Sequence, residues 1–321
     1  MSFQKQEREL QERYFSQHFS GKLLPGQALQ LSPEHRALNL APHLRQELTD
    51  LFDHSDPLQR IQWHRYANHG CSSQVCCVNF LYSVAQDIKR LQRWVEHITG
   101  EREVVICPIE ERHQVERNIA FEWFPAIDYL NESRGGTKSR GANSTSVDAA
   151  IAYQSQGERC LLFIEWKYIE SYSNTRSEKQ QCGDITRDQR YHNLWRRPHG
   201  PLAEEIPFTL QDFYLEPWYQ LLRQQMLAYH TELDPLSGYD RVSVAHISPS
   251  KNKALHTLRG ERFKRYSSDM SLSSNTFELF RSLLAEPWRT RFIPLSVEDA
   301  FKHLRTDVNM SWLRTRYPNL F

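Results

Sequence analysis

The chain has 321 residues, with 40 Lys and Arg against 39 Asp and Glu, so its formal net charge is only +1. Global charge therefore indicates no anionic partner, and any nucleic-acid footprint has to be local. No apolar run approaches the ~20 residues of a membrane span, which excludes a membrane partner at this level and favours a globular protein. The N-terminus shows no apolar secretory segment and the 6 Cys form no CxxC pair, so we expect a cytoplasmic protein.

The pattern along the chain predicts three parts. Residues 1–70 form a helical N-terminal extension, 71–250 an α/β core, and 251–321 a helical C-terminal region packed on that core. The extension is expected to hold a surface helix with few core contacts and two short helices, at 3–18, 43–53 and 57–66.

The core begins with apolar residues at helical spacing over 73–98, which predict one long helix closed by Gly100. Four strands are expected next, with a hairpin turn at 154–158 before the last: 104–106, 119–124, 147–153 and 159–168. An amphipathic helix at 216–231 and a strand at 241–247 follow, and then helices at 251–258, 275–286, 297–304 and 309–316. This order predicts a mixed α/β sheet with helices on both faces.

Three charged residues stand near the ends of two paired strands. Strand alternation places Glu165 and Lys167 on one face and Trp166 on the other, and the neighbouring strand brings Asp148 alongside. Burying two carboxylates and an ammonium is costly unless something offsets the charge. A divalent cation between the carboxylates is one such solution, and oxygen-rich sites favour Mg²⁺.

These residues resemble the PD-(D/E)xK nuclease superfamily, whose restriction-endonuclease-like core is a helix, a three-strand meander, a helix and a strand. Asp148, Glu165 and Lys167 match its motif, although Val147 stands where the family motif has Pro. The likeness covers roughly residues 73–248. Four segments look closer still to a bacterial family of restriction endonucleases: SSQVCCVNFLY at 72–82, TSVDAAIAY at 145–153, IEWKYIESY at 164–172 and PWYQLLRQQMLA at 217–228.

The resemblance implies an enzyme that hydrolyses DNA phosphodiester bonds with Mg²⁺, or with Mn²⁺ in its place. Asp148, Glu165 and the backbone carbonyl of Trp166 would hold the metal, and Lys167 would orient water or stabilise the transition state. A Glu-x-Lys pattern alone has no specificity, because a chain of this composition contains about one by chance. A salt bridge at a strand end is its simpler interpretation. A non-catalytic nucleic-acid-binding or assembly protein on the same fold is therefore the alternative function. No GxxxxGK[ST] occurs, so no nucleotide cofactor is expected.

Further polar residues are weaker candidates. Glu122 would add a third acid from the preceding strand, or is an exposed carboxylate. The Glu170 side chain either contacts the site or is exposed to solvent, and we favour the second. In helix 216–231, Gln220 fits the closer family's PWYQL pattern and Gln225-xxx-Tyr229 fits an exonuclease-type spacing, but such glutamines, Gln224 included, are also common on solvated helices.

Two basic clusters are candidate DNA-phosphate contacts. The first lies in the polar loop before Asp148 and comprises Arg134, Lys138 and Arg140. The second comprises Lys251, Lys253 and Arg259, continued by Arg262, Lys264 and Arg265. Such charges would hold phosphates without reading sequence, unless they are ordinary solvated side chains. DNA is the expected partner, and a homodimer, the choice of RNA or DNA and the endo- or exonuclease mode stay open.

Overall fold

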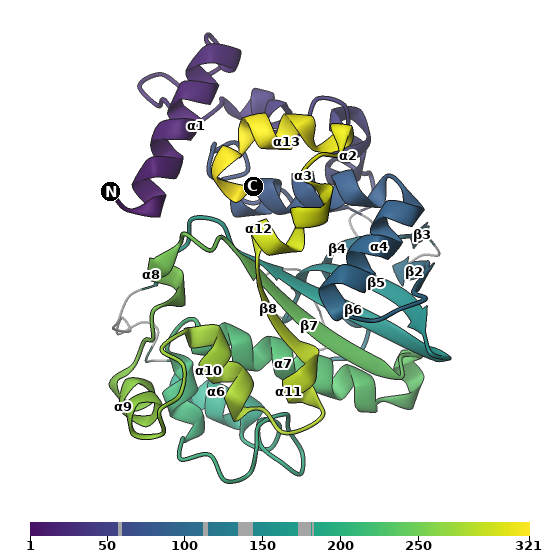
Figure 1. Cartoon of the computed structure of the whole chain (residues 1–321), viewed down its shortest axis with the longest axis vertical. Coiled ribbons are helices and arrows are strands. Elements are labelled where there is room, and N and C mark those ends of the chain that lie inside the picture. Colours follow the sequence, from purple (N-terminus) through teal and green to yellow (C-terminus); the bar gives the residue numbers. More distant parts are fainter. Residues whose placement is uncertain (57–59, 112–114, 134–143, 173–180, 182) are drawn as a thin grey trace.

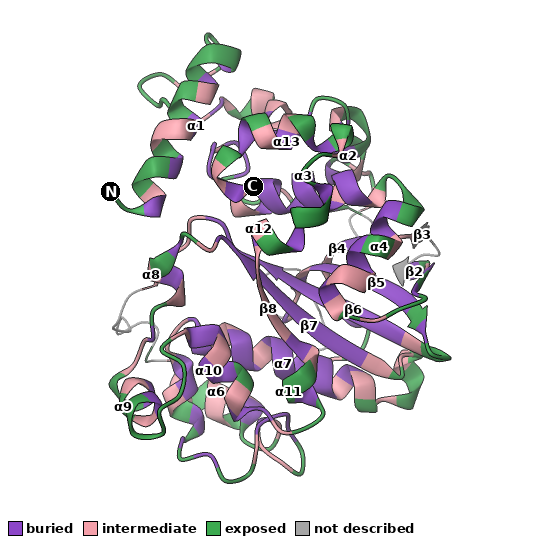
Figure 2. Ribbon diagram, in the orientation of Figure 1, coloured by how far each residue is buried: buried purple, intermediate pink, exposed green. Residues whose placement is uncertain are grey.

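A mixed β-sheet forms the centre of the molecule, and helices cover both of its faces (Figure 1). The computed structural model describes residues 1–321 except for 57–59, 112–114, 134–143, 173–180 and 182. Buried side chains gather along the central strands and on the helix faces turned toward them (Figure 2). They form one hydrophobic core on each side of the sheet.

The six strands of the sheet follow the order β1-β5-β6-β7-β8, and β4 pairs with β5 on the edge where β1 also pairs. β5 and β6 are antiparallel, whereas β6, β7 and β8 run parallel to one another. The strands are β1 (Val105–Cys107), β4 (Ala120–Trp123), β5 (Val147–Ser155), β6 (Glu158–Trp166), β7 (Arg241–Ser248) and β8 (Phe292–Ser296). A separate antiparallel pair is formed by β2 (Ile109–Glu111) and β3 (Val115–Arg117).

The expected hairpin turn connects β5 to β6. Ser155 pairs with Glu158, which leaves Gln156 and Gly157 as a two-residue loop. Both have positive φ, 54° and 84°, as the favoured type I′ hairpin turn requires. This turn fixes the register of the two strands that carry the candidate site.

One face of the sheet packs against helices from both ends of the chain: α2 (Arg45–Phe52), α3 (Ser73–Ala85), α4 (Ile88–Thr99), α12 (Val297–Ala300) and α13 (Ser311–Arg316). The single helix expected over 73–98 is wrong, because the Asp87 side chain accepts a hydrogen bond from Arg90 N and starts α4 as a separate helix. Gly100 ends α4 in the left-handed conformation, as expected.

The other face packs against α7 (Trp218–Leu233), which connects β6 to β7, and against smaller helices: α6 (Asp184–Tyr191), α8 (Lys253–His256), α9 (Glu261–Asp269), α10 (Thr276–Leu283) and α11 (Trp288–Arg291). Short 3-10 helices lie at Pro33–Asn39, Leu210–Tyr214, Pro235–Ser237, Lys302–Leu304, Val308–Met310 and Pro318–Leu320. The order of helix, three-strand meander, helix and strand is confirmed. None of the helices in the described ranges is both long and apolar enough to cross a membrane.

The C-terminal region, expected to be helical, also contributes the edge strand β8. Its central Pro294 cannot donate to a ladder, and an edge position tolerates this because β8 pairs only with β7. The same proline hides the strand from pattern-based prediction. Residues beyond β8 return to the first face, so the C-terminus lies beside α3 (Figure 1).

The N-terminal helix α1 (Phe3–Phe19) makes more internal contacts than its sequence predicts. Its Glu7 and Gln11 are fully buried. The Glu7 carboxylate accepts a hydrogen bond from Tyr168 Oη, and Gln11 Nε2 donates to Tyr168 Oη at 3.2 Å and to Arg316 O at 3.0 Å. Buried polar groups need such partners, so this face of α1 is polar although it is covered.

Candidate active site

Asp148 and Glu165 lie opposite each other on β5 and β6. Ala149 pairs with Ile164, so the next pair along the two strands is Asp148 with Glu165, and their side chains share one face. Asp148 Oδ2 accepts a hydrogen bond from Trp166 N at 2.7 Å. Lys167 Nζ lies 2.5 Å from Glu165 Oε1. The structure thus brings together the three residues of the sequence motif.

Helix α7 supplies two amides to the same carboxylate. Gln220 Nε2 donates to Glu165 Oε1 at 2.7 Å, and Gln224 Nε2 donates to Glu165 Oε2. The spacing of four residues places both amides on one helix face. Tyr229 lies further along α7 and donates to Pro198 O at 2.8 Å, and the buried Gln225 amide has no hydrogen-bond partner in the described part of the chain. The Gln225-xxx-Tyr229 pair therefore makes no bond to these acids.

The charges of this cluster influence one another strongly. Burial, and then the neighbouring Glu165 carboxylate, raise the pKa of Asp148 well above its usual range. Burial opposes the charge on Lys167, but Glu165, Tyr172 and Glu170 outweigh it, and the pKa of Lys167 is raised. The cluster contains two acids and one ammonium, so it carries one carboxylate in excess.

The donor set fits a hard divalent cation. Among the described residues nothing donates a hydrogen bond to Asp148 Oδ1, and Asp148 lines an open cavity. Within these same residues no group of three or more His, Cys, Asp or Glu gathers for a metal. The ligands that the resemblance implies are Asp148, Glu165 and the Trp166 carbonyl, with water in the remaining positions, as Mg²⁺ prefers. Both Glu165 oxygens already accept from Lys167 and the two amides, and Trp166 O accepts from Ser73 Oγ at 3.5 Å.

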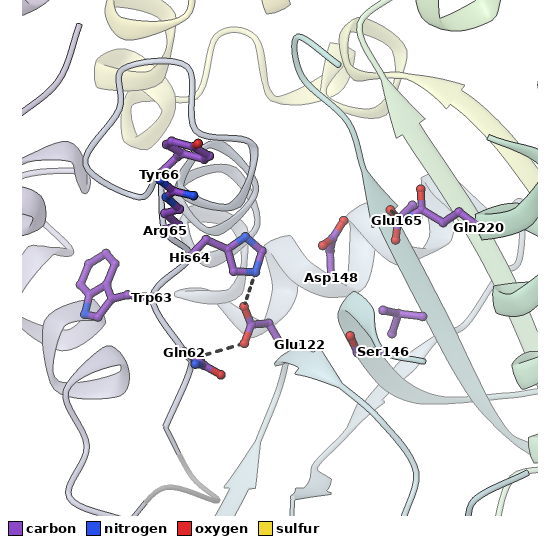
Figure 3. Close-up of a pocket in the computed structure, with 11 residues that line it drawn as sticks. Gln62, Trp63, His64, Arg65, Tyr66, Glu122, Ser146, Asp148, Glu165 and Gln220 are labelled. Carbon is purple, nitrogen blue, oxygen red and sulfur yellow. Dashed lines mark hydrogen bonds and ion pairs between the residues drawn. The ribbon is translucent and has the colours of Figure 1, made fainter. Parts of the chain in front are cut away.

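A cavity of about 680 Å³ opens in front of these acids. One wall contains Asp148, Glu165 and Gln220, and the facing wall is formed by residues 62–66 of the N-terminal region (Figure 3). The helix expected at 57–66 is wrong for residues 60–66, which form irregular chain and a turn. Sequence patterns give no signal for this second wall, because its contacts to the core are distant in the chain.

Glu122 lines the cavity but is bound to the second wall. Its carboxylate forms an ion pair with His64 at 3.1 Å and accepts hydrogen bonds from Gln62 N at 3.2 Å and Gln74 Nε2 at 2.5 Å. Its φ of 51° is in the left-handed region, which is uncommon for a residue with a side chain. The hydrogen bond to Glu122 raises the pKa of His64. In this structure Glu122 bonds to that wall and not to the Asp148 cluster.

The remaining candidates lie outside the cavity lining. Glu170 is partly buried, and its carboxylate accepts a hydrogen bond from Tyr168 N at 2.5 Å, within its own loop. Lys251, Lys253 and Arg265 are exposed, and Arg259 is half-buried and donates to Ala254 O at 3.0 Å. The other two residues of this cluster pair with acids: Arg262 with Asp212 and Lys264 with Glu261. Arg134, Lys138 and Arg140 lie outside the described residues.

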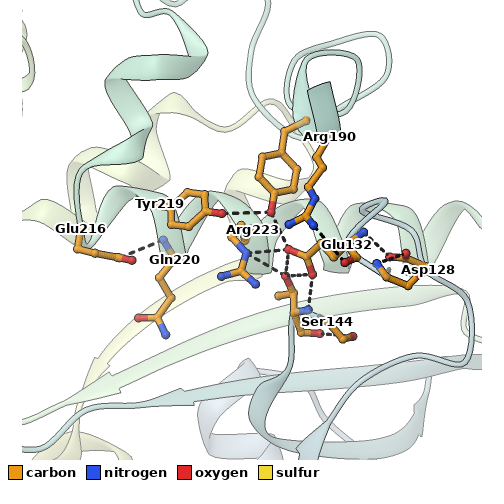
Figure 4. Close-up of polar contacts among 11 residues, drawn as sticks. Asp128, Glu132, Ser144, Arg190, Glu216, Tyr219, Gln220 and Arg223 are labelled. Carbon is orange, nitrogen blue, oxygen red and sulfur yellow. Dashed lines mark hydrogen bonds and ion pairs between the residues drawn. The ribbon is translucent and has the colours of Figure 1, made fainter. Parts of the chain in front are cut away.

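A second buried carboxylate holds the start of β5 against α7 (Figure 4). Glu132 Oε1 accepts hydrogen bonds from Arg223 Nε at 3.0 Å and from Tyr191 Oη at 2.7 Å. Both Glu132 oxygens also contact Thr145 Oγ1, at 2.9 and 2.8 Å. Thr145 precedes Asp148 by three residues, so this network fixes Asp148 relative to the helix that carries Gln220 and Gln224.

Comparisons with known proteins agree with this geometry. A family model described as "Restriction Endonuclease associating with ARP" matches residues 4–318, nearly the whole chain. Searches of curated proteins and of solved structures gave no match. The family match and the observed order of elements agree with the fold that the motif residues imply.

Proposed function

The chain belongs to the family of restriction endonucleases associating with ARP, and from this premise we propose that it hydrolyses DNA phosphodiester bonds with Mg²⁺, or Mn²⁺, held by Asp148 and Glu165. One observation carries the proposal. The buried Glu165 and Lys167 meet the partly buried Asp148 at a cavity that both acids line, and no described residue donates a hydrogen bond to Asp148 Oδ1.

Each residue of the cluster has a role in this proposal. A cation held by Asp148 and Glu165 would supply Lewis-acid chemistry to the scissile phosphate and to an attacking water. The Lys167 ammonium uses one of its three N–H donors on Glu165, and the others serve a water or the negative charge that develops on the phosphate. Gln220 and Gln224 hold the Glu165 carboxylate in one orientation.

A protein that only binds nucleic acid on this fold is the alternative, and it needs no pair of acids beside a lysine at a cavity. The association with ARP is what the description of the family names, and a homodimer of this chain stays open.

The test incubates the purified chain with plasmid, linear duplex and single-stranded DNA, in Mg²⁺, Mn²⁺ or EDTA. We expect cleavage of at least one substrate with metal and none in EDTA. Asp148→Asn is nearly isosteric, keeps the acceptor for Trp166 N, and should lower the rate about a hundredfold or more. Asp50→Asn, an exposed acid on α2, is the matched control and should cleave at the wild-type rate.

The proposal fails if the wild type binds DNA but cleaves none of the three substrates with either metal. That result would favour the binding-only alternative. Full activity of Asp148→Asn would refute the assignment of this acid, whatever the source of the cleavage.

A further inference from the structure

The two walls of the cavity differ in charge, because on the second wall the Glu122 carboxylate pairs with His64 and the Arg65 guanidinium has no such acid among the described residues. Asp148 and Glu165 lie on one side, and His64 and Arg65 lie on the other (Figure 3). A phosphodiester placed at the acids on one side would meet the Arg65 guanidinium on the other. The second wall is therefore placed to contact the same DNA strand as the acids.

This wall is fixed to the rest of the fold. Gln74 of α3 donates to Gln62 O at 2.7 Å and accepts from His64 N at 3.0 Å, and Glu122 holds the same segment. The Trp63 ring stacks on Phe52 with centroids 3.8 Å apart, and its Nε1 donates to Asp53 at 2.8 Å. Gln62, Trp63 and His64 are thus bound to the rest of the fold.

The next two residues are available for a ligand. Tyr66 is 58% exposed, and the Arg65 guanidinium lies 5.3 Å from the centre of its ring. Arg65 has no carboxylate partner at ion-pair distance in the part of the chain that the structure describes. Both residues line the cavity. An exposed aromatic ring beside a guanidinium offers a stacking surface for a base and a donor set for a phosphate.

We propose that Arg65 and Tyr66 bind an unpaired nucleotide next to the scissile phosphate, with Arg65 on a phosphate and Tyr66 stacked on a base. Within a duplex each base is already stacked on its neighbours, so only an unpaired nucleotide presents a free face to Tyr66. The site thus selects single-stranded DNA, or duplex with unpaired ends, over continuous duplex. This inference rests on the proposed nuclease function for its place beside the acids.

The test measures binding of the full chain to a fluorescent single-stranded oligonucleotide and to the matched duplex, in EDTA, so that no cleavage occurs. Tyr66→Ala should weaken single-strand binding about fivefold or more and leave duplex binding unchanged, and Tyr66→Phe should restore the wild-type affinity. Arg65→Ala should weaken single-strand binding and reduce the salt slope by about 0.7. Arg102→Ala is the matched control, an exposed arginine at the far end of the sheet near Ser155.

Three results would overturn the inference: no measurable single-strand binding, equal affinities for Tyr66→Ala and Tyr66→Phe, or equal weakening of both DNA forms by Tyr66→Ala. Because the assay contains no metal, these outcomes are independent of catalysis. Selective loss of single-strand binding in Tyr66→Ala together with no cleavage by the wild type would support this binding site and refute the nuclease.

Discussion

Two buried acid–base clusters contact α7, and they differ in how completely their charges are satisfied. Among the described residues the Glu132 carboxylate pairs with one cation, Arg223, and its oxygens also accept from Thr145 and Tyr191. In the other cluster Lys167 pairs with Glu165, and Asp148 has no cation at ion-pair distance among the described residues. Glu132 is closed in by protein, whereas Asp148 and Glu165 line the cavity.

The difference separates a contact that stabilises the fold from one that is ready for a ligand. A buried carboxylate with one cation and several hydrogen-bond donors has its charge and its acceptors satisfied within the protein. Its role is to stabilise the folded state. Two neighbouring acids repel each other when both are ionised, and this repulsion destabilises the folded state. Here the repelling acids lie at a cavity. Excess negative charge in that place is typical of a site completed by a cation.

The largest effect on stability is expected at the Glu132 cluster. Arg223→Met leaves the buried Glu132 without its cation and should lower the free energy of unfolding by about 3 kcal/mol. Urea unfolding followed by circular dichroism measures the change. Arg281→Met, which breaks the exposed pair with Glu278, is the matched control and should cost less than about 1 kcal/mol. Equal, small losses in the two variants would show that the Glu132 network is not a stabilising element.

A substitution in the cluster of Asp148, Glu165 and Lys167 is expected to change the free energy of unfolding in the opposite direction. Asp148→Asn removes one of two repelling charges and should raise the free energy of unfolding in EDTA at pH 8. The pKa of Asp148 is raised in the folded state, so the folded protein binds more protons than the unfolded chain once the pH exceeds about 4. Wild-type stability should therefore fall as the pH rises from about 4 through the folded pKa of Asp148.

The variant lacks this titration, so the gain should be present at pH 8 and should shrink as the pH approaches 4. Paired urea titrations at several pH values measure the difference and cancel the contribution of the other acids. A stability difference that is constant over this range, or a loss at pH 8, would contradict the repulsion between Asp148 and Glu165.

Sequence patterns locate the cluster of Asp148, Glu165 and Lys167, because strand alternation and the turn between the two strands determine it. Strand alternation and a two-residue turn bring Asp148 opposite Glu165, and both signals lie within about twenty residues of chain. The Glu132 cluster is not predictable in this way. Glu132 and Arg223 are 91 residues apart, and their contact depends on how α7 packs on the sheet.

The same reasoning explains the other differences. The N-terminal wall of the cavity is placed by side-chain contacts from Glu122 and Gln74, which no periodicity encodes. The polar face of α1 resembles a solvated surface in the sequence, yet Glu7 and Gln11 are buried because Tyr168 and Arg316 supply partners. Long-range polar contacts thus account for these two differences.

The smallest effect concerns the basic cluster at 251–265, where satisfied and unsatisfied charges occur side by side. Lys251 and Lys253 are exposed, and the Lys251 ammonium makes only a 3.5 Å contact with Asn319 O among the described residues. Arg262 and Lys264 pair with Asp212 and Glu261 at 2.5 and 2.6 Å. If the cluster binds DNA, the two lysines release more counterions than the paired residues, because binding does not first have to break an ion pair.

The double variant Lys251→Ala/Lys253→Ala should then lower the salt slope of duplex binding, equally for all sequences. The expected decrease is about 0.9 for each phosphate that these lysines neutralise in the wild type. Arg262→Ala/Lys264→Ala is the matched control and should change the slope less, because its charges are already paired. A salt titration of affinity in Ca²⁺ measures both variants. An unchanged slope in the first variant would show that Lys251 and Lys253 are ordinary solvated charges.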